Sequence, residues 1–262
     1  MGQGMRILIT NDDGINAPGL AILDAIAHTL TDDVWTVAPA FEQSGVGHCI
    51  SYTHPTMLSQ FGPRRFAAEG SPADCVLAGL YHVMQDAAPD LILSGVNRGN
   101  NAADNTLYSG TIGAAMEAAL QGIPAIAMSQ YYGPDNSKLD NPFEAAAVHG
   151  AKVVDDLWKH GGWDDADYRL FYNVNFPPCP ASAVKGTKVV RQGHRPTSKF
   201  SVSAQTSPTG RDFMWIKGGP QHEPTGEGTD AQACLDGFTA ITPMRADLTD
   251  MKMVEALKGK LS

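Results

Sequence analysis

The sequence predicts an α/β fold, a doubly wound and mostly parallel sheet, followed by β-hairpin extensions. Short apolar runs rich in β-branched residues alternate with helical patterns up to about residue 176. Beyond that point the chain is rich in Pro, Gly, Ser and Thr and contains only short strand-like pieces. With 262 residues and 43% hydrophobic content, the chain is long enough for one large domain with a sizeable appendage.

Each element of the predicted core follows from its local pattern. Strands are expected at residues 6–10, 34–38, 90–94, 123–128 and 170–176. Helices are expected at residues 18–30, 109–122 and 141–160, and another begins at Pro72 with Ser71 as its cap. Between the second strand and the Pro72 helix, residues 50–68 predict an antiparallel excursion. This order places the carboxyl ends of several strands at one edge, where open α/β sheets bind ligands.

The second part of the chain has a different character. We expect residues 1–176 to form the catalytic core, and residues 177–262 to supply hairpin arms, a closing strand and a C-terminal helix. The strand-like pieces GTKVVRQG, SVSAQTS and RDFMWIKGG indicate hairpins. A protruding hairpin cannot bury both of its faces alone, so we expect a homodimer or tetramer. The alternative is that these pieces fold back on their own core.

Composition excludes several classes of partner. A net charge of -9 with 19 dispersed basic residues argues against a nucleic-acid polymer or an anionic membrane surface. No apolar run approaches the roughly 18 residues of a membrane span, and the N-terminus lacks a signal-peptide pattern, so we expect a cytoplasmic protein. Cys49, Cys75, Cys179 and Cys234 lack CxxC spacing, which indicates small buried apolar residues and neither a zinc site nor a disulfide framework.

Two adjacent acids, Asp12 and Asp13, follow the first strand directly. Such a pair, together with neutral oxygen ligands, suits a hard divalent cation such as Mg²⁺ or Mn²⁺. A bare Asp-Asp-Gly triplet is equally compatible with a capped turn and a solvated acid. Ser44, Asn97 and Asn100 fall in loops at the same predicted edge, and this convergence favours a cation site.

An anion site is predicted close by. Ser109, Gly110 and Thr111 offer hydroxyls and free backbone N–H groups where a helix begins, which suits a phosphate. The connection before this helix is long, polar and rich in Gly and Asn, and such loops are more often functional than idle. A cation facing an anion-binding helix start is a layout for phosphoryl chemistry.

Five segments carry a resemblance to a known family: ILITNDDGINAPGL, APAFEQSGVGH, GSPADCV, LILSGVNRGNN and YSGTIGAAMEA. In this order and spacing they resemble the SurE family, the stationary-phase survival nucleotidases, and TDAQACLDGFTAITPM is similar to that family's closing segment. The resemblance implies a Rossmann-like core with swapped C-terminal hairpins in dimers or dimers of dimers. It also implies metal-dependent hydrolysis of nucleoside 5′- and 3′-monophosphates, and of short polyphosphate in some members.

The same resemblance implies roles for individual residues, with one divalent cation per subunit. The implied metal ligands are Asp12, Asp13, Ser44 and Asn97. The implied catalytic residues are Asp12, Asp13, Asn100 and Ser109. The implied substrate-binding residues are Asn11, Arg98, Asn100, Ser109, Gly110 and Thr111.

Other residues near these motifs also receive assignments. Gln43 is uncharged and stands where many members of the family carry a basic residue, and Arg98 is an alternative source of positive charge for the phosphate. His48 is interpreted as a packing or hydrogen-bonding residue. Phe213 and Trp215 could cover a nucleoside base across a subunit boundary, although hairpin aromatics are more often packing residues.

Three other classes of protein could place acids after a first strand. A haloacid-dehalogenase-like phosphatase needs an Asp-x-Asp arrangement, whereas Asp12 is followed by Asp13 and Gly14. A receiver-like, Mg²⁺-binding phospho-switch stays open as the alternative, although the LILSGV strand does not end in a phospho-accepting Asp. A dinucleotide-binding enzyme requires GxGxxG after the first strand, and the motif is missing there.

Overall fold

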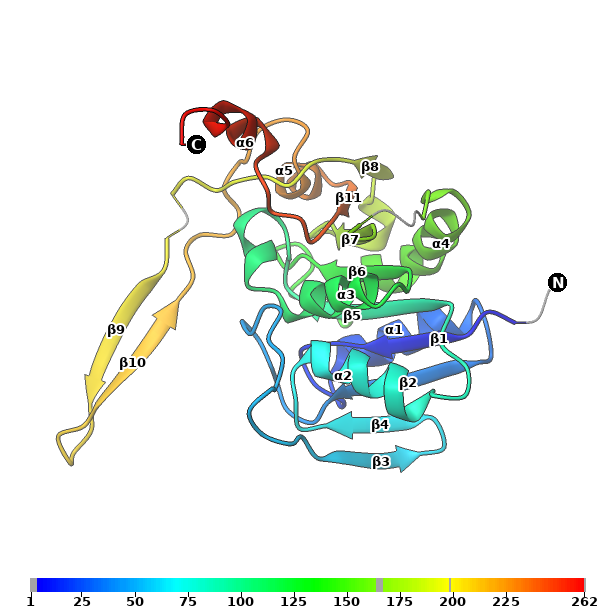
Figure 1. The fold of residues 1–262 in the computed structure, drawn as a ribbon. Coiled ribbons are helices and arrows are strands. Elements are labelled where there is room, and N and C mark those ends of the chain that lie inside the picture. The colour runs from blue at the N-terminus through cyan, green and yellow to red at the C-terminus, as the bar shows by residue number, and fades with distance from the viewer. Residues whose placement is uncertain (1–3, 164–166, 198, 262) are drawn as a thin grey trace.

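The computed structural model describes residues 4–163, 167–197 and 199–261. Within these ranges the strands form one nine-stranded, mostly parallel sheet and a separate two-stranded antiparallel sheet (Figure 1). Helices cover both faces of the large sheet. The predicted α/β class with hairpin extensions is therefore confirmed.

The large sheet has the strand order β3-β4-β2-β1-β5-β6-β7-β11-β8. Its strands are β1 (Ile7–Thr10), β2 (Val34–Pro39), β3 (Leu58–Gly62), β4 (Arg65–Ala68), β5 (Leu91–Arg98), β6 (Ala125–Gln130), β7 (Phe171–Phe176), β8 (Thr187–Val189) and β11 (Thr239–Met244). The pairings β3–β4 and β7–β11 are antiparallel, and the other pairings are parallel. Two strands from beyond residue 176, β8 and β11, thus belong to the same sheet as the core strands.

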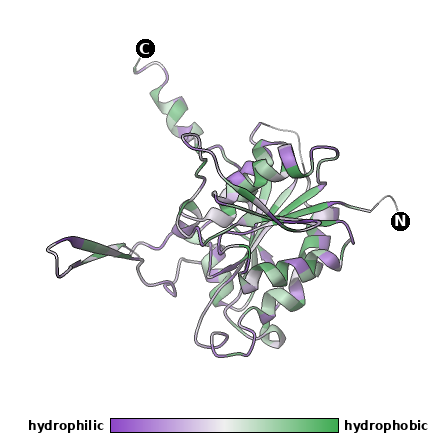
Figure 2. Cartoon of the chain, turned by 90° about the horizontal axis from the view of Figure 1, so that it is seen from below, coloured by the Kyte–Doolittle hydropathy of each residue, from purple (hydrophilic) through white to green (hydrophobic). Residues whose placement is uncertain are grey.

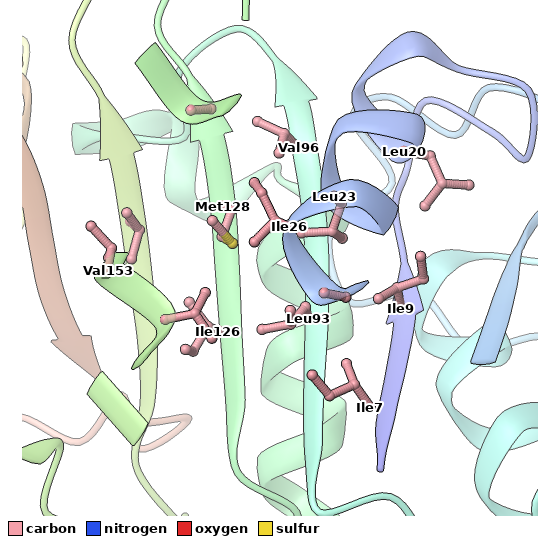
Figure 3. Close-up of a cluster of buried hydrophobic side chains, with 14 of the residues drawn as sticks. Ile7, Ile9, Leu20, Leu23, Ile26, Leu93, Val96, Ile126, Met128 and Val153 are labelled. Atoms are coloured by element: carbon pink, nitrogen blue, oxygen red, sulfur yellow. The ribbon is translucent and has the colours of Figure 1, made fainter. Parts of the chain in front are cut away.

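Residues on successive positions of β1 point to opposite faces of the sheet. Ile7 and Ile9 pack with helices α1 (Pro18–His28) and α4 (Glu144–His160), as Figure 3 shows for the α1 contacts. Leu8 packs on the other face with α2 (Pro72–Ala78) and α3 (Gly110–Leu120). The apolar run of β1 is therefore continuous because both of its faces are buried.

Helix α2 begins as its sequence predicts. Pro72 occupies the first helical turn, and the Ser71 side chain accepts a hydrogen bond from the Asp74 backbone N–H. Asp74 returns the bond, since its carboxylate accepts from the backbone N–H of Ser71 at 2.8 Å. The two bonds form a capping box and satisfy donors that the helix cannot use.

The order of strands reverses between β1 and β5. From β1 the chain moves through α1 to β2 on one side, whereas β5, β6 and β7 extend on the other side. The loops after β1 and β5 consequently diverge and leave a crevice at the carboxyl edge of the sheet, the usual ligand site of such folds. This topology brings together the Asp pair and the segment around Asn97.

Strand β5 is longer than predicted, and one site residue lies within it. The sequence places Asn97 in a loop after residue 94, but β5 continues to Arg98 and Asn97 pairs with Ser129. The register between β5 and β6 shifts between Ser94 and Asn97 by one extra residue, a β-bulge that re-aims the following side chains. Gly95 permits this irregularity: its φ is +142°, and a Cβ there would lie 2.2 Å from the Met128 carbonyl oxygen.

The C-terminal part adds a hairpin and two short helices. Strands β9 (Ser201–Thr206) and β10 (Asp212–Lys217) pair antiparallel, and every residue in them is exposed. The hairpin stands clear of the large sheet in Figures 1 and 2. Helix α5 (Asp230–Leu235) packs beside β11, whereas α6 (Met251–Leu257) buries none of its residues.

None of the helices in the described parts of the chain combines the length and apolar character needed to cross a membrane. The cysteines do not behave uniformly. Cys75 and Cys234 are buried as expected, but Cys49 is exposed and Cys179 is half-buried because each lies in a loop. All four thiols are free.

Candidate active site

Backbone hydrogen bonds bring the predicted site segments together at the crevice between β1 and β5. The N–H of Gln43, in the serine loop after β2, donates to the carbonyl oxygen of Asp12 at 2.7 Å. The N–H of Arg98 donates to Oδ2 of Asp13 at 3.0 Å. The loops after β1 and β2 and the end of β5 are thereby held as one unit.

Asp12 is almost fully buried and lies against the start of α3. Its Oδ1 accepts a hydrogen bond of 2.7 Å from the hydroxyl of Thr111, in the first turn of α3. Burial raises the pKa of Asp12 to about 6, and the neighbouring charge of Asp13 adds to this rise, while the bond from Thr111 opposes it. The carboxylate is therefore oriented by the helix start, but its negative charge is only partly compensated.

The approach of α3 to Asp12 requires glycine at the first position of the helix. A Cβ on Gly110 would lie 2.9 Å from the Asp12 Cβ and 3.0 Å from Cγ of Pro72. Both contacts are too short for any larger residue unless the helix moves away. Gly110 thus acts by letting the helix start approach the acid.

Asp13 is more accessible than Asp12 and faces a different set of groups. Burial raises its pKa, and the backbone bond and positive charge of Arg98 act in the opposite direction. Asp13 and Arg98 also line a neighbouring cavity of about 450 Å³, whose walls include Tyr132 and Phe143. The acid pair therefore lies between two adjoining hollows.

Asn97 and Ser44 present neutral oxygens near the acid pair. Asn97 is buried, and its Nδ2 donates to the carbonyl oxygen of Gly99 at 3.0 Å, which leaves Oδ1 available as a ligand. Ser44 is exposed, and its hydroxyl donates to the Glu42 carboxylate at 2.9 Å. Its oxygen can still accept a cation because the bond to Glu42 uses only the hydroxyl hydrogen.

Ser109 caps α3. Its Oγ accepts a hydrogen bond of 3.0 Å from the backbone N–H of Ile112, so the hydroxyl hydrogen is left for another acceptor. The positive end of the α3 dipole points into the same region and favours a negative group there. In this structure that negative group is the Asp12 carboxylate, which takes the Thr111 hydroxyl.

A cavity of about 350 Å³ joins most of the predicted residues. Its lining includes six of them: Asp12, Ser44, Asn97, Arg98, Asn100 and Ser109. Four predicted residues do not line it. Gly110 and Thr111 lie against Asp12, and Asp13 lines the neighbouring cavity. The fourth is Asn11, whose Nδ2 donates to the Gly14 carbonyl oxygen at 2.9 Å. Asn11 thus shapes the loop after β1.

The cavity also has walls that the sequence did not predict. They are Gly45, Gly99, Asn101, Asn105, Tyr108, Phe200 and Gln221. Asn105 and Tyr108 belong to the polar loop before α3, whose length was the available signal. Phe200 and Gln221 flank the hairpin, about a hundred residues farther along the chain, where no local motif indicates their position.

Two further predictions concern side chains near the site. Nε2 of His48 forms a 2.6 Å hydrogen bond with Oε2 of Glu117 on α3, which agrees with a hydrogen-bonding role. The aromatic side chains of Phe213 and Trp215 are exposed on the hairpin and do not line the cavity within this chain.

The donor set fits a hard divalent cation. In the described parts of the chain, no group of three or more His, Cys, Asp or Glu side chains could hold a metal. The available ligands are instead two carboxylates and the neutral oxygens of Asn97 and Ser44, a set typical of Mg²⁺ or Mn²⁺. Burial raises the pKa of both acids, and the hydrogen bonds that they accept and the charge of Arg98 beside Asp13 only partly oppose this rise.

Known proteins resemble this chain over nearly its whole length. Residues 7–199 match the family described as Survival protein SurE. The chain is 64% identical over 258 residues to "5'-nucleotidase SurE" of Roseobacter denitrificans, covering 97% of this chain and 99% of that protein. It is 63% identical over 262 residues to the protein of the same name from Jannaschia sp.. The crystal structure of the SurE protein from Aquifex aeolicus superposes with a TM-score of 0.81 at 34% identity, covering 98% of this chain and 100% of that one. The chain therefore belongs to the SurE family.

Proposed function

We propose that this protein is a nucleotidase that hydrolyses nucleoside 5′- and 3′-monophosphates to nucleoside and phosphate, using one divalent cation per subunit. The observation that carries the proposal is the acid pair at the end of β1: Asp12 lines a polar cavity with Asn97, Asn100 and the capping residue Ser109, and Asp13 lines the adjoining cavity. Relatives about 64% identical over nearly the whole chain bear the name 5'-nucleotidase, which supports the substrate class.

Asp12, Asp13, Ser44 and Asn97 would hold the cation, Mg²⁺ or Mn²⁺. When bound, such a cation lowers the pKa of a water molecule and neutralises charge on a phosphoryl group. Thr111 would keep Asp12 in its binding orientation through their 2.7 Å hydrogen bond. The Arg98 N–H would do the same for Asp13.

The remaining cavity residues would bind the phosphate of the substrate. The Ser109 hydroxyl hydrogen is not used by its cap and can be donated to a phosphate oxygen. Asn100 can donate from its amide nitrogen, and the Arg98 side chain adds a positive charge at the cavity wall. Such donors stabilise negative charge that develops during hydrolysis, which is their catalytic contribution.

The test is release of inorganic phosphate from 5′-AMP and 3′-AMP by purified protein, with Mg²⁺ or Mn²⁺ and again with excess EDTA. We expect release that depends on the metal. Short polyphosphate is tested in the same assay as a further candidate substrate. No release with any metal, from protein whose circular dichroism shows a folded chain, would contradict the proposal. Stable phosphorylation by a small phosphodonor, without turnover, would then favour the receiver-like switch.

We further propose that residues 177–262 serve assembly into a homodimer or tetramer in the cytoplasm. The hairpin presents Val202, Met214 and Ile216 on one face and Phe213 and Trp215 on the other, all exposed. Four free cysteines suit a reducing compartment. Sedimentation velocity tests the assembly, and a monomer at micromolar concentration would contradict it.

A further inference from the structure

A buried arginine lies behind the cavity and contacts two of the residues that line it, Asn100 and Gln221. Arg195, in the segment between β8 and β9, is 1% exposed. Its Nη2 donates to Oδ1 of Asn100 at 2.8 Å, its Nη1 to the carbonyl oxygen of Ala102 at 3.0 Å, and its Nε to the carbonyl oxygen of Gln221 at 3.2 Å. A carboxylate oxygen of Asp104 lies 3.7 Å from Nη1. Burying a guanidinium is costly unless its donors are paired. We therefore asked what the buried side chain of Arg195 does for Asn100, one of the cavity residues that it contacts.

The partners of Asn100 determine which end of its amide faces which group. Its Oδ1 accepts from Arg195, from Nδ2 of Asn105 at 3.2 Å and from the backbone N–H of Ala102 at 3.4 Å. All three partners are donors. Its Nδ2 faces an acceptor, Oε1 of Gln221, at 3.3 Å. The oxygen end of the amide is therefore turned to the protein, and the nitrogen end has the weaker partner.

This orientation matters for an anion. Phosphate oxygens accept hydrogen bonds, so only the NH₂ end of an asparagine attracts them, while the oxygen end repels them. The two ends have nearly the same size and shape, and sterics alone cannot choose between them. Arginine offers only donors and can pair with the oxygen end alone. Arg195 therefore selects the orientation that an anion site requires.

We propose that Arg195 is a positioning residue that holds Asn100 with its NH₂ group available to the substrate phosphate. The inference rests on the proposed function, in which Asn100 contacts that phosphate. Gln221 completes the arrangement, because its Oε1 also accepts from Asn105 at 2.7 Å and so keeps an acceptor opposite the Asn100 nitrogen. Arg195 precedes the hairpin and Gln221 follows it, so both roots of the arm contact the phosphate-binding loop.

The experiment uses the full chain with Mn²⁺ and two readouts, the Kd of inorganic phosphate by calorimetry and kcat and KM for 5′-AMP. The variants are Arg195→Lys, Asn100→Ala and the double variant. Arg191→Lys, on the same segment but exposed and outside the cavity lining, is the matched control. Lysine keeps the charge, but its single nitrogen cannot take the three positions from which Nε, Nη1 and Nη2 of Arg195 donate, so the donor opposite Asn100 is no longer held in place.

We expect Arg195→Lys to weaken phosphate binding about tenfold and to lower kcat, as loss of one charged hydrogen bond does. In the Asn100→Ala background the same substitution should change neither value further, because no amide is left to orient. A purely structural role predicts equal effects in both backgrounds, and that result would overturn the proposal. Unchanged phosphate affinity in Arg195→Lys would overturn it as well.

A second variant keeps the proposal testable if Arg195→Lys does not fold. Asn100→Asp retains the acceptor for Arg195 and removes the NH₂ group, so it should fold with at least the wild-type Tm and lose phosphate affinity at least tenfold. Phosphate affinity within twofold of wild type would contradict the proposal. Suppose that Arg195→Lys weakens phosphate binding only when Asn100 is present, but that the wild type hydrolyses no nucleotide. The proposed function then fails while the inference holds. If the wild type binds no phosphate, the inference fails too.

Discussion

Two regions of the molecule depart in opposite ways from the usual distribution of polar residues outside and apolar residues inside. They are the crevice between β1 and β5 and the β9–β10 hairpin. At the crevice, polar and charged side chains such as Asp12, Asn97 and Ser109 are buried. On the hairpin, large apolar side chains such as Met214 and Trp215 are exposed. Both arrangements are unfavourable for an isolated folded chain.

The difference between the two regions indicates what each one binds. Buried carboxylates and amides that are hydrogen-bonded at one end and open at the other suit a cation and an anion. Exposed apolar side chains on a two-stranded ribbon suit another protein surface, because a ribbon alone cannot bury them. Substitutions in one region should therefore change ion binding and catalysis, and substitutions in the other should change assembly. The largest expected effect is at the crevice.

Removing one charge at the crevice should abolish catalysis and spare the fold. Asp12→Asn keeps the shape of the side chain and an oxygen for the Thr111 bond. We expect activity to fall on the order of 10³-fold, since both cation binding and charge balance depend on this carboxylate. The Tm of the metal-free protein should not fall, because a buried like-charged pair is relieved. Near wild-type activity under limiting metal would contradict the assignment.

Adding charge to the hairpin should have the converse effect, a change of assembly without a change of the core. In Met214→Lys/Ile216→Lys, two side chains on one face become cationic. Burial of each original side chain contributes about 1.5–3 kcal/mol, so the double variant should sediment as a monomer where the wild type associates. Thr206→Lys, at the polar end of β9, is the control. A variant that assembles as the wild type does would show that this face is not the interface.

Filling the space at the start of α3 tests how closely the helix must approach the acid. Gly110→Ala should destabilise the fold by about 1–3 kcal/mol and reduce activity, because its Cβ would displace Asp12 or the helix. Gly62→Ala is the matched control, since the atom nearest to its Cβ would lie at 3.7 Å. Thermal unfolding and phosphate release measure both effects. Equal behaviour of the two variants would contradict the steric argument.

The smallest expected effect concerns the bond between the serine loop and α3. The hydrogen bond from His48 holds the pKa of Glu117 below its ordinary value of 4.5. A lowered carboxylate pKa stabilises the fold at neutral pH, and this stabilisation is lost as the pH falls below about 4.5. Glu117→Gln should therefore cost about 1–2 kcal/mol at pH 7 and less near pH 3. A difference in Tm that does not depend on pH would argue against this origin.

The sequence predicted much of the fold because its local patterns are strong. The buried strands are continuous apolar runs, and Ser71 and Pro72 mark the start of α2. The predicted ends of elements were less accurate. Strand β5 continues past residue 94 to Arg98, since its last pairs with β6 compensate for the bulge. No pattern within the strand itself reveals these partners, because Asn97 pairs with Ser129, far along the chain.

Much of the candidate site could also be predicted, because its residues lie in motifs that occur together in one family. Asp12, Asn97, Asn100 and Ser109 do line one cavity. The structure adds that Thr111 bonds to Asp12. That detail depends on the depth at which α3 approaches β1, and Gly110 controls this depth in three dimensions.

By itself, the sequence determined the class of the fold, the family and the acid pair at a strand end, since each is written in short contiguous segments. Only the tertiary structure decided which residues from the later part of the chain line the cavity or support it from behind. Arg195 reaches Asn100 across 95 positions of the chain, and Gln221 reaches it across 121. Neither residue carries a local signal, because their positions result from how β8, the hairpin roots and β11 join a sheet begun far earlier in the chain.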